Sequence, residues 1–320
     1  CIKDHLGLRG DNNFPVPGQG NVDHELMFRT LFAAGFNGPM AIERVDGRDG
    51  GNNKVPPDVM DERLAAAHRY LAPLLDKQFA LVIPDLPGYG QSDAPQSRAN
   101  HSPYDKRSMA RSMCEVMDAL GHQQFRLAGH DRGGRVAYRL ALDHPERLLR
   151  LCTLDIVPTY EMWARLTPVS AMKIFHWTFL AQPFPLPEKM IGHMPAEYLE
   201  WKISSWNGEN NLSVFDPRAL EHYRAAFKQP ARLHASCEDY RAGATTDRLN
   251  DEADKKTGRK IQCPLLALWG ESGIPSKGAN PLDIWREWAK DVSGGPIKSG
   301  HFLPEENPAD TAKAMLAFFA

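Results

Sequence analysis

Residues 125–145, with the sequence FRLAGHDRGGRVAYRLALDHP, decide the fold of this chain. An apolar run ends in Gly129-His130-Asp131-Arg132-Gly133 and passes directly into a helical pattern over 132–144. This arrangement has the form of a nucleophile elbow, G-x-Nu-x-G, with aspartate where serine is more common. Its glycines lack a Cβ atom, which lets the strand and the helix approach each other around a strained turn. The alternative is that Asp131 merely caps the helix.

Strand-like apolar runs alternate with amphipathic helical stretches along most of the chain. This pattern predicts an α/β protein with a mostly parallel sheet. Residues 157–258 are rich in Trp, Met, His and Pro and contain no clear strand, so we expect an all-helical insertion there. The predicted strands are residues 40–45, 80–85, 125–129, 149–155 and 264–269, and the clearest predicted helices are 61–75 and 105–120.

Two further polar residues follow strand-like runs, as Asp131 does. Asp155 ends the run 149–155, and His301 lies in a Gly-His loop before the last predicted helix, 307–319. Open α/β sheets place their sites at the edge where the carboxyl ends of the strands meet. Each residue taken alone is explained as well by a turn or a surface position. Together, in the order nucleophile, acid and histidine, they predict a catalytic triad.

The composition excludes several classes of function. Among 320 residues, 38 Lys and Arg oppose 40 Asp and Glu, and the net charge of −2 provides no attraction to nucleic acid or to an anionic membrane. No apolar run reaches the roughly 18 residues of a membrane-spanning helix. The five cysteines form no CxxC pair, so we expect neither a disulfide scaffold nor a zinc site. A cytoplasmic location with reduced thiols is the corresponding expectation.

Residues 78–320 resemble an α/β-hydrolase of the haloacetate (fluoroacetate) dehalogenase type. The resemblance implies a hydrolase core formed by residues 77–156 and 259–320, with a helical cap over 157–258. The segments that carry it are FALVIPDLPGYGQSDAP (79–95), AGHDRGGRVAYRLALDHPERL (128–148), LDIVPTYEMW (154–163), HWTFLAQPFPLPEKMI (176–191), EDYRAGATTD (238–247) and SGHFLPEENP (299–308).

The same resemblance implies a reaction and roles for the triad. Asp131 would be the nucleophile, His301 the general base, and Asp155 the residue that orients His301. The reaction would be hydrolytic removal of halide from a short 2-haloacid through an aspartyl ester, without metal or organic cofactor. Attack on an sp3 carbon requires an anionic nucleophile, and a carboxylate is ionised at neutral pH.

A small anionic haloacid also needs fixed positive charge and donors for the halide. Arg132 and Arg135 would clamp the substrate carboxylate, because guanidinium matches carboxylate in fork geometry. Without the resemblance, their i, i+3 spacing is explained equally well by a solvated helix face. Donors placed where charge develops would stabilise the leaving halide. The resemblance assigns this task to His176, Trp177 and Tyr240, which a packed helix would otherwise explain.

Alternative hydrolase activities remain open. Haloalkane dehalogenases usually carry Trp directly after the nucleophile, whereas this chain carries Arg132. Epoxide hydrolases share the aspartate elbow but use cap tyrosines to protonate the epoxide oxygen. The chain has tyrosines available for that task, so an epoxide hydrolase is the second candidate: Tyr160, Tyr198, Tyr223 and Tyr240. The resemblance leaves a homodimer open as the oligomeric state.

Residues 1–76 depart from the hydrolase pattern. They resemble the last repeats of a xylose-isomerase-like sugar phosphate isomerase/epimerase barrel, most specifically over 15–45, where Glu43 matches a metal ligand. A complete barrel needs about 250 residues, and one carboxylate does not make a metal site. We therefore expect a fusion in which barrel-derived βαβ strands complete the hydrolase-like sheet. A metal-dependent isomerase fragment and an inactive fusion are the rival interpretations.

The departure has a consequence for the second chemical step. No His-Gly pair occurs before residue 78, so the HGxP-type loop that supplies one oxyanion donor is missing. The other donor is the backbone N–H of Arg132. Loss of one donor costs about 10²–10³ in rate. We therefore expect an impaired enzyme that releases halide in a burst and then turns over slowly.

Overall fold

The computed structural model of the protein describes residues 72–75, 78–273 and 279–320. The chain divides into two compact units, Cys1–Leu64 with Leu75–Ile83, and Ala65–Leu74 with Pro84–Ala320. All described strands belong to the second unit. The predicted strand 40–45, Glu43 and the barrel-like segment up to residue 71 lie outside the described residues, and of the predicted helix 61–75 only α4 (Ala72–Leu75) is described.

The described sheet has four parallel strands in the order β1-β2-β3-β4. Three of the predicted strands are confirmed within a residue at either end, because long apolar runs between turn residues fit a strand covered on both faces. Each strand is joined to the next by at least one helix, as parallel pairing requires. The strands are β1 (Phe125–His130), β2 (Leu148–Leu154), β3 (Leu265–Gly270) and β4 (Val292–Ile297).

The strand predicted over 80–85 is wrong, because these residues have no regular secondary structure. Their side chains are exposed or half-buried. The prediction rested on the apolar run ALVIPD, and apolar composition indicates which side chains can be buried. It does not supply the hydrogen-bonding partner that makes an extended segment a strand.

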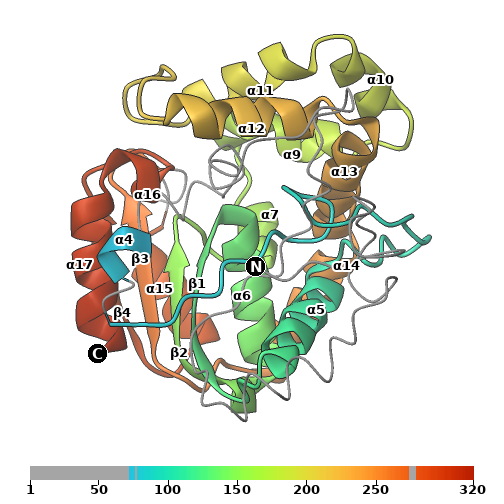
Figure 1. The fold of residues 1–320 in the computed structure, drawn as a ribbon. Coiled ribbons are helices and arrows are strands. Elements are labelled where there is room, and N and C mark those ends of the chain that lie inside the picture. The colour runs from blue at the N-terminus through green and yellow to red at the C-terminus, as the bar shows by residue number, and fades with distance from the viewer. Residues whose placement is uncertain (1–71, 76–77, 274–278) are drawn as a thin grey trace, which may run out of the picture. The chain divides into compact units, whose positions relative to one another are not determined.

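Helices cover the sheet on both faces. Figure 1 shows α6 and α17 on opposite sides of the strands, and α15 shares the face of α6 because the rings of Tyr138 and Trp285 lie 5.9 Å apart. The main core lies between α6 and the sheet and contains Leu140 and Leu151, both fully buried. The covering helices are α5 (Lys106–Ala119), α6 (Asp131–Asp143), the 3-10 helix Pro145–Arg147, α15 (Pro281–Trp288), α16 (Leu303–Glu306) and α17 (Pro308–Phe319).

Eight helices and no strand lie between β2 and β3, which confirms the all-helical character predicted for this region. We call residues 159–257 the helical segment. Five of its helices have Pro in the first turn, where the missing N–H costs nothing. The helices are α7 (Thr159–Ala164), α8 (Pro168–Lys173), α9 (Phe175–Leu180), α10 (Leu186–Gly192), α11 (Pro195–Ser204), α12 (Pro217–Phe227), α13 (Pro230–Ala244) and α14 (Thr246–Thr257).

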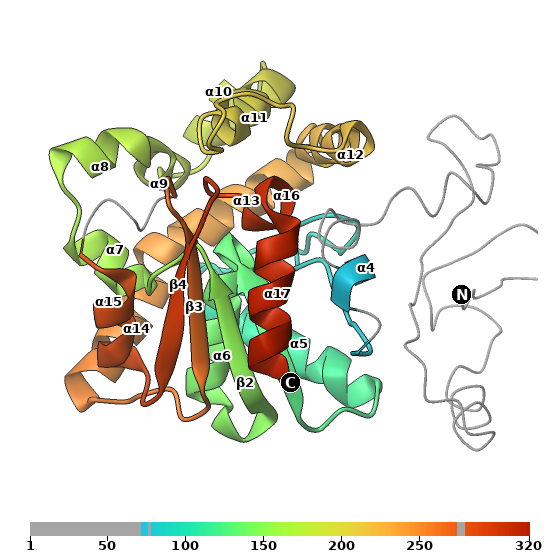
Figure 2. The ribbon, with the colours of Figure 1, turned by 90° about the vertical axis from the view of Figure 1, so that its left-hand side faces the viewer.

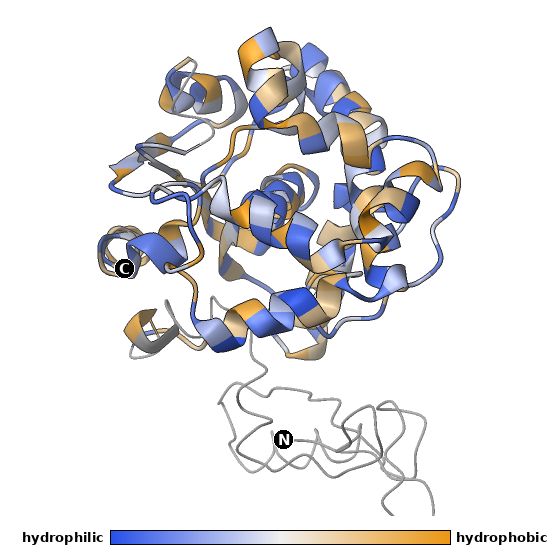
Figure 3. Ribbon diagram, turned by 90° about the horizontal axis from the view of Figure 1, so that it is seen from above, coloured by the Kyte–Doolittle hydropathy of each residue, from blue (hydrophilic) through white to orange (hydrophobic). Residues whose placement is uncertain are grey.

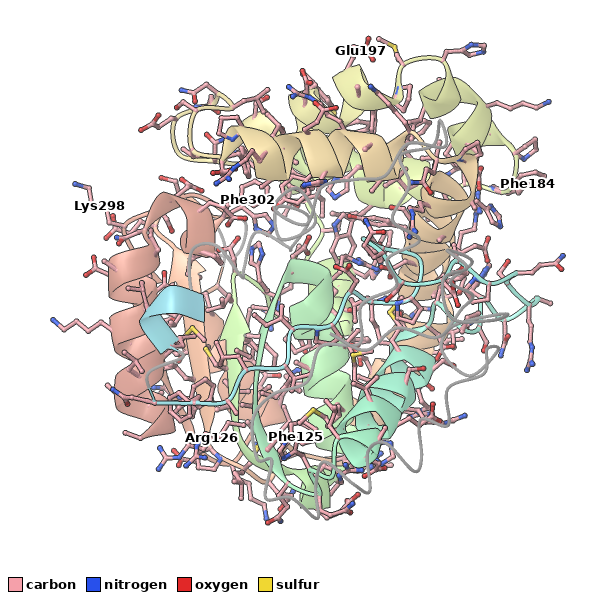
Figure 4. The ribbon with its side chains drawn as sticks, in the orientation of Figure 1. Phe125, Arg126, Phe184, Glu197, Lys298 and Phe302 are labelled. Carbon is pink, nitrogen blue, oxygen red and sulfur yellow. The ribbon has the colours of Figure 1, made fainter. Side chains whose placement is uncertain are left out.

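The middle helices of the helical segment, α9 to α12, lie over the carboxyl ends of the strands. Figures 1 and 2 both show α9 to α12 above the sheet, with α13 descending beside α6. Seen from above, these helices carry hydrophilic and hydrophobic residues side by side, as amphipathic helices do (Figure 3). Phe302 lies at the level between sheet and segment (Figure 4), where its ring is 5.0 Å from that of Phe215. The sheet and the helical segment therefore meet near the loop that carries Phe302.

Candidate active site

The turn after β1 holds Asp131 in a strained conformation. Its φ is 45°, a left-handed value that a residue with a Cβ rarely adopts. His130 is the N-cap of α6, and Asp131 is the first helical residue, so Asp131 does not cap the helix. A Cβ on Gly129 would lie 2.5 Å from the Gly133 oxygen, and one on Gly134 would lie 2.8 Å from the Gly129 oxygen. The close approach thus needs Gly129 and Gly134, whereas Gly133 has open space, contrary to the expectation from the motif.

The structure brings the three predicted triad residues together. His301 Nδ1 lies 2.6 Å from Asp155 Oδ2, and His301 Nε2 lies 3.6 Å from Asp131 Oδ2. The His301 and Asp155 side chains are buried, and that of Asp131 is 28% exposed. Among the described residues, His301 Nε2 is a buried atom without a hydrogen-bond partner. One imidazole therefore connects a buried carboxylate to a carboxylate that other molecules can reach.

The backbone supports Asp155 and His301 from several sides. Asp155, with φ 52°, accepts a hydrogen bond from the Gly270 N–H at 2.9 Å. The His301 N–H donates to the Trp206 carbonyl at 3.0 Å, and the His301 carbonyl lies 2.8 Å from His130 Nε2. Because Trp206 belongs to the helical segment, the segment helps to fix the position of the histidine.

Glu306 fixes the loop that carries His301. Its carboxylate accepts hydrogen bonds from the N–H groups of Gly300 at 2.7 Å, Phe302 at 2.9 Å and Gly208 at 2.8 Å. The first two donors flank His301, and Gly208 follows Trp206 in the helical segment. Charge-assisted bonds of this kind are about twice as strong as neutral ones. The histidine loop and the helical segment are therefore held by one carboxylate.

The electrostatics of the pair follow from burial and opposite charge. Burial alone would lower the pKa of His301, but Asp131 and Asp155 outweigh it and raise that pKa to about 10. Burial would raise the pKa of Asp131, but His301 and the guanidinium groups of Arg132 and Arg135 hold it well below its usual value. Asp131 is therefore a carboxylate, and His301 an imidazolium, at neutral pH.

Arg132, the residue after Asp131, is buried, and its guanidinium group is held by hydrogen bonds along one edge and by an aromatic ring on one face. Its Nε donates to Asp239 Oδ2 at 2.9 Å, and its Nη2 donates to Asp239 Oδ1 and to the Asp239 carbonyl. The guanidinium carbon lies 4.3 Å from the centroid of the Tyr240 ring. The alternative interpretation, in which Arg132 belongs to a solvated helix face, is wrong because the residue is only 9% exposed.

Arg135 is buried one helical turn further along α6. Its Nη1 donates to the Val157 carbonyl at 3.1 Å and to Thr159 Oγ1 at 3.2 Å. Its guanidinium carbon lies 4.6 Å from the centroid of the Trp177 ring. Its Nε is buried and has no hydrogen-bond partner among the described residues. A buried cationic donor without an acceptor is costly, and an anionic ligand would supply one.

The three predicted halide donors lie next to one another. The His176 and Tyr240 ring centroids are 5.3 Å apart, and those of Trp177 and Tyr240 are 6.3 Å apart. Burial lowers the pKa of His176 and raises that of Tyr240, and the charge of Asp131 acts on both groups. Imidazole, indole and phenol can each donate one hydrogen bond. Within the described part of the chain, His176 Nδ1 is buried without a hydrogen-bond partner.

Three residues of the site were not predicted from the sequence: Trp206, Lys202 and Asp239. The Trp206 ring lies 4.5 Å from that of His176 and 5.3 Å from that of His301. Lys202 Nζ lies 4.2 Å from the centroid of the Trp206 ring, and burial lowers the pKa of Lys202 to about 8. The sequence around these residues, WKISSW and SCEDYRAG, mixes charged and polar residues with apolar ones and carries no signal that marks them as buried.

Metal and membrane features were searched over residues 72–75, 78–273 and 279–320. No group of three or more His, Cys, Asp or Glu side chains there could hold a metal ion. No helix in these ranges is both long and apolar enough to cross a membrane. The prediction that the reaction needs no cofactor stays a prediction.

A sequence model of the family described as alpha/beta hydrolase fold matches residues 64–308, and the chain belongs to this family. The chain is 40% identical over 250 residues to a fluoroacetate dehalogenase from Burkholderia sp., covering 78% of this chain and 81% of the relative. It is 30% identical over 254 residues to a soluble epoxide hydrolase from Corynebacterium sp. (strain C12), covering 79% and 85%. An alpha/beta hydrolase structure from Nostoc sp. PCC 7120 superposes with a TM-score of 0.77 at 47% identity, covering 81% and 88%.

The chain is accordingly an α/β-fold hydrolase, with relatives of both the dehalogenase and the epoxide hydrolase kind. The barrel resemblance predicted for residues 1–76 finds no support in these comparisons. The hydrolase family model begins at residue 64, inside that segment.

Proposed function

We propose that the chain removes halide from short 2-haloacids by hydrolysis through an ester of Asp131. The observation that carries this proposal is the combination of an anionic nucleophile on the elbow with two buried arginines on the first turns of the same helix. The anion suits attack on a saturated carbon, and the arginines suit a substrate that is itself an anion. The 40% identity to a fluoroacetate dehalogenase supports the same assignment.

In the first step, an oxygen of Asp131 forms a bond to the halogen-bearing carbon as the carbon–halogen bond breaks. The halide leaves with the bonding electron pair toward His176, Trp177 and Tyr240, which act as donors. These donors matter most for fluoride, which is a poor leaving group and accepts hydrogen bonds strongly. The product of this step is an ester in which the Asp131 carboxyl group is uncharged, while the substrate carboxylate keeps its charge between the arginines.

Before the second step, His301 releases its own proton to solvent, because its pKa falls once the charge of Asp131 is gone. His301 Nε2 then takes a proton from water, and the hydroxide adds to the carboxyl carbon of the Asp131 ester. Collapse of the intermediate breaks the bond to the alkoxide oxygen, which receives the proton from His301. The water oxygen stays on Asp131 as part of a carboxylic acid, which gives its proton to His301 and so restores the resting ion pair. The 2-hydroxy acid leaves with an oxygen from Asp131. Asp155 stabilises the imidazolium that forms between these events. The helical segment covers the reaction as a cap.

The haloacid assignment is preferred to the epoxide assignment because of the tyrosines. Of the four tyrosines considered, Tyr240 is the one that contacts Arg132, beside the nucleophile. The other three contact different residues: the Tyr198 ring stacks on that of Phe227 with centroids 6.2 Å apart, the Tyr223 ring lies 6.5 Å from that of Phe215, and Tyr160 lies near Lys255. An epoxide has no negative charge, so it would also leave the remaining N–H groups of Arg132 and Arg135 without an anionic acceptor.

The deciding experiment is detection of fluoride and chloride with ion-selective electrodes during incubation with fluoroacetate and chloroacetate. We expect release by the unmodified chain and none by Asp131→Asn. Equal release by both proteins refutes the proposal. Diol formation from styrene oxide without halide release from the haloacids would assign the epoxide activity instead. The time course of halide release also tests the predicted burst. The structure cannot test it, because it describes only residues 72–75 of the segment before residue 78, in which the HGxP-type loop was sought.

A further inference from the structure

Arg132 contacts a buried cluster of charged side chains that consists of Asp239, Lys106 and Asp247. Asp239, on α13, is fully buried and faces donors from three other parts of the fold. Besides Arg132, it accepts a hydrogen bond from Tyr89 Oη at 2.7 Å and one from Lys106 Nζ, itself 1% exposed. Lys106 Nζ also lies 3.6 Å from Asp247 Oδ2. A buried carboxylate paired with two cations and one phenol is fixed in position.

Asp239 accepts hydrogen bonds from the Nε and Nη2 edge of the Arg132 guanidinium group. The Nε hydrogen goes to Oδ2, and Nη2 serves both Oδ1 and the Asp239 carbonyl, the latter at 3.1 Å. Tyr240, the next residue of α13, covers one face of the group. An arginine has five N–H donors, so the two on Nη1 are left without a hydrogen bond from the described residues. Arg132 can therefore approach a ligand with its Nη1 end.

Arg135 presents the complementary geometry. Its Nη1 is used by Val157 and Thr159, and its Nε is buried and unpartnered among the described residues. The edge formed by Nε and Nη2 is thus the part of Arg135 that a carboxylate can meet in the bidentate manner. Arg135 thus offers the edge formed by Nε and Nη2, whereas Arg132 offers its Nη1 end. The hydrogen bonds that each group makes to neighbouring residues determine this difference.

We propose that Asp239, supported by Lys106 and Tyr89, is a positioning residue that turns Arg132 so that its Nη1 end meets the substrate carboxylate. Without Asp239, Arg132 would be free to rotate and its buried charge would lack a partner. The proposal rests on the proposed function, because it assigns the orientation of one of the two arginines that bind the haloacid.

The test is Asp239→Asn, with steady-state chloride release from chloroacetate and inhibition by the product glycolate. We expect the KM for chloroacetate and the Ki for glycolate to rise together by about 10- to 100-fold, the loss of one charged hydrogen bond, while kcat changes by less than about threefold. A merely structural role lowers the fraction of active protein, which reduces kcat and leaves KM and Ki unchanged. That result overturns the proposal.

Asp254→Asn is the matched control. Asp254 is also a buried aspartate of the helical segment, and it pairs with Arg139, which lies on the same helix α6 one turn beyond Arg135. We expect its KM and Ki to stay within about twofold of the unmodified chain. Equal rises in both variants count against a specific role for Asp239.

Tyr89→Phe keeps the proposal testable if Asp239→Asn does not fold. It removes one hydroxyl and leaves both cations paired with Asp239, and we expect a rise of about three- to tenfold in KM and Ki. Unchanged values in folded Tyr89→Phe and in Lys106→Met overturn the proposal. Absence of halide release by the unmodified chain refutes the proposed function instead, so the two failures are distinguishable.

Discussion

Replacing Asp131 by asparagine should lower the pKa of His301 by about three units. The nearest atoms of the two side chains are 3.6 Å apart. Two unit charges at about 3.6 Å in an effective dielectric constant of about 20 attract each other by about 5 kcal/mol, and one pKa unit corresponds to about 1.4 kcal/mol. Although burial opposes it, this attraction, with that of Asp155, accounts for the rise of the His301 pKa from 6.5 to about 10.

The change matters because asparagine is uncharged, as the Asp131 carboxyl group would be in the proposed ester. In the resting protein His301 is protonated and cannot take a proton from water. In the proposed reaction, formation of the ester would remove the charge of Asp131, so the pKa of His301 would fall and the ring would become a base. The charge of Asp131 would then keep His301 protonated until the ester has formed.

The assay is an NMR titration of histidine-labelled protein, with the His301 signal among 12 histidines assigned by its loss in His301→Gln. Asp283→Asn, an exposed position on α15, serves as the control and should shift nothing. A fall of less than one unit in Asp131→Asn would refute the reasoning. Because the folded pKa of His301 lies above its unfolded value, the pair stabilises the fold below about pH 6.5, and this stability is lost as the pH rises through about 10.

Three further predictions concern the clamp, the halide donors and the elbow. Arg135→Lys should raise the KM for chloroacetate about 10- to 100-fold, because lysine cannot offer the Nε edge; steady-state kinetics would show it, and an unchanged KM would contradict it. Trp177→Phe should reduce fluoride release by about 10²-fold or more and chloride release less, since fluoride depends more on donors; equal losses for both halides would exclude this role. Gly134→Ala should destabilise the fold by about 1–3 kcal/mol through the clash with Gly129, whereas Gly133→Ala, with nothing within 4 Å, should be neutral or stabilising by up to about 1 kcal/mol; urea unfolding of the two variants compares them directly.

The triad could be predicted because topology largely determines where its members lie. Asp131, Asp155 and His301 each follow a run that is apolar enough to be a parallel strand, and parallel strands deliver such residues to one edge. The local motif predicted correctly where the turn lies, but not which glycine makes the close contact with the strand. It marked Gly133 as the close approach, but the helix turns so that the Gly134 Cα faces the strand, and only coordinates show this.

The surroundings of the arginines could not be predicted in the same way. Residues 235–243 of α13 are all buried, so the helix lacks the one-sided periodicity that identifies an inward face. Asp239 is therefore indistinguishable from a surface charge in the sequence. Lys106 and Tyr89 reach it from positions more than 130 residues away, a separation at which sequence pattern carries no information about contact.

The contact between α6 and α13 would link the proposed binding of substrate to the placement of the helical segment, because the same side chains take part in both. Arg132 is held by Asp239 on an edge and by Tyr240 on a face, and Tyr240 is also one of the proposed halide donors. A shift of α13 would move the clamp and a halide donor together. In the proposed reaction, the elbow would position Asp131 relative to the sheet, while the helical segment would position the substrate relative to Asp131, and the chemistry would require both at once.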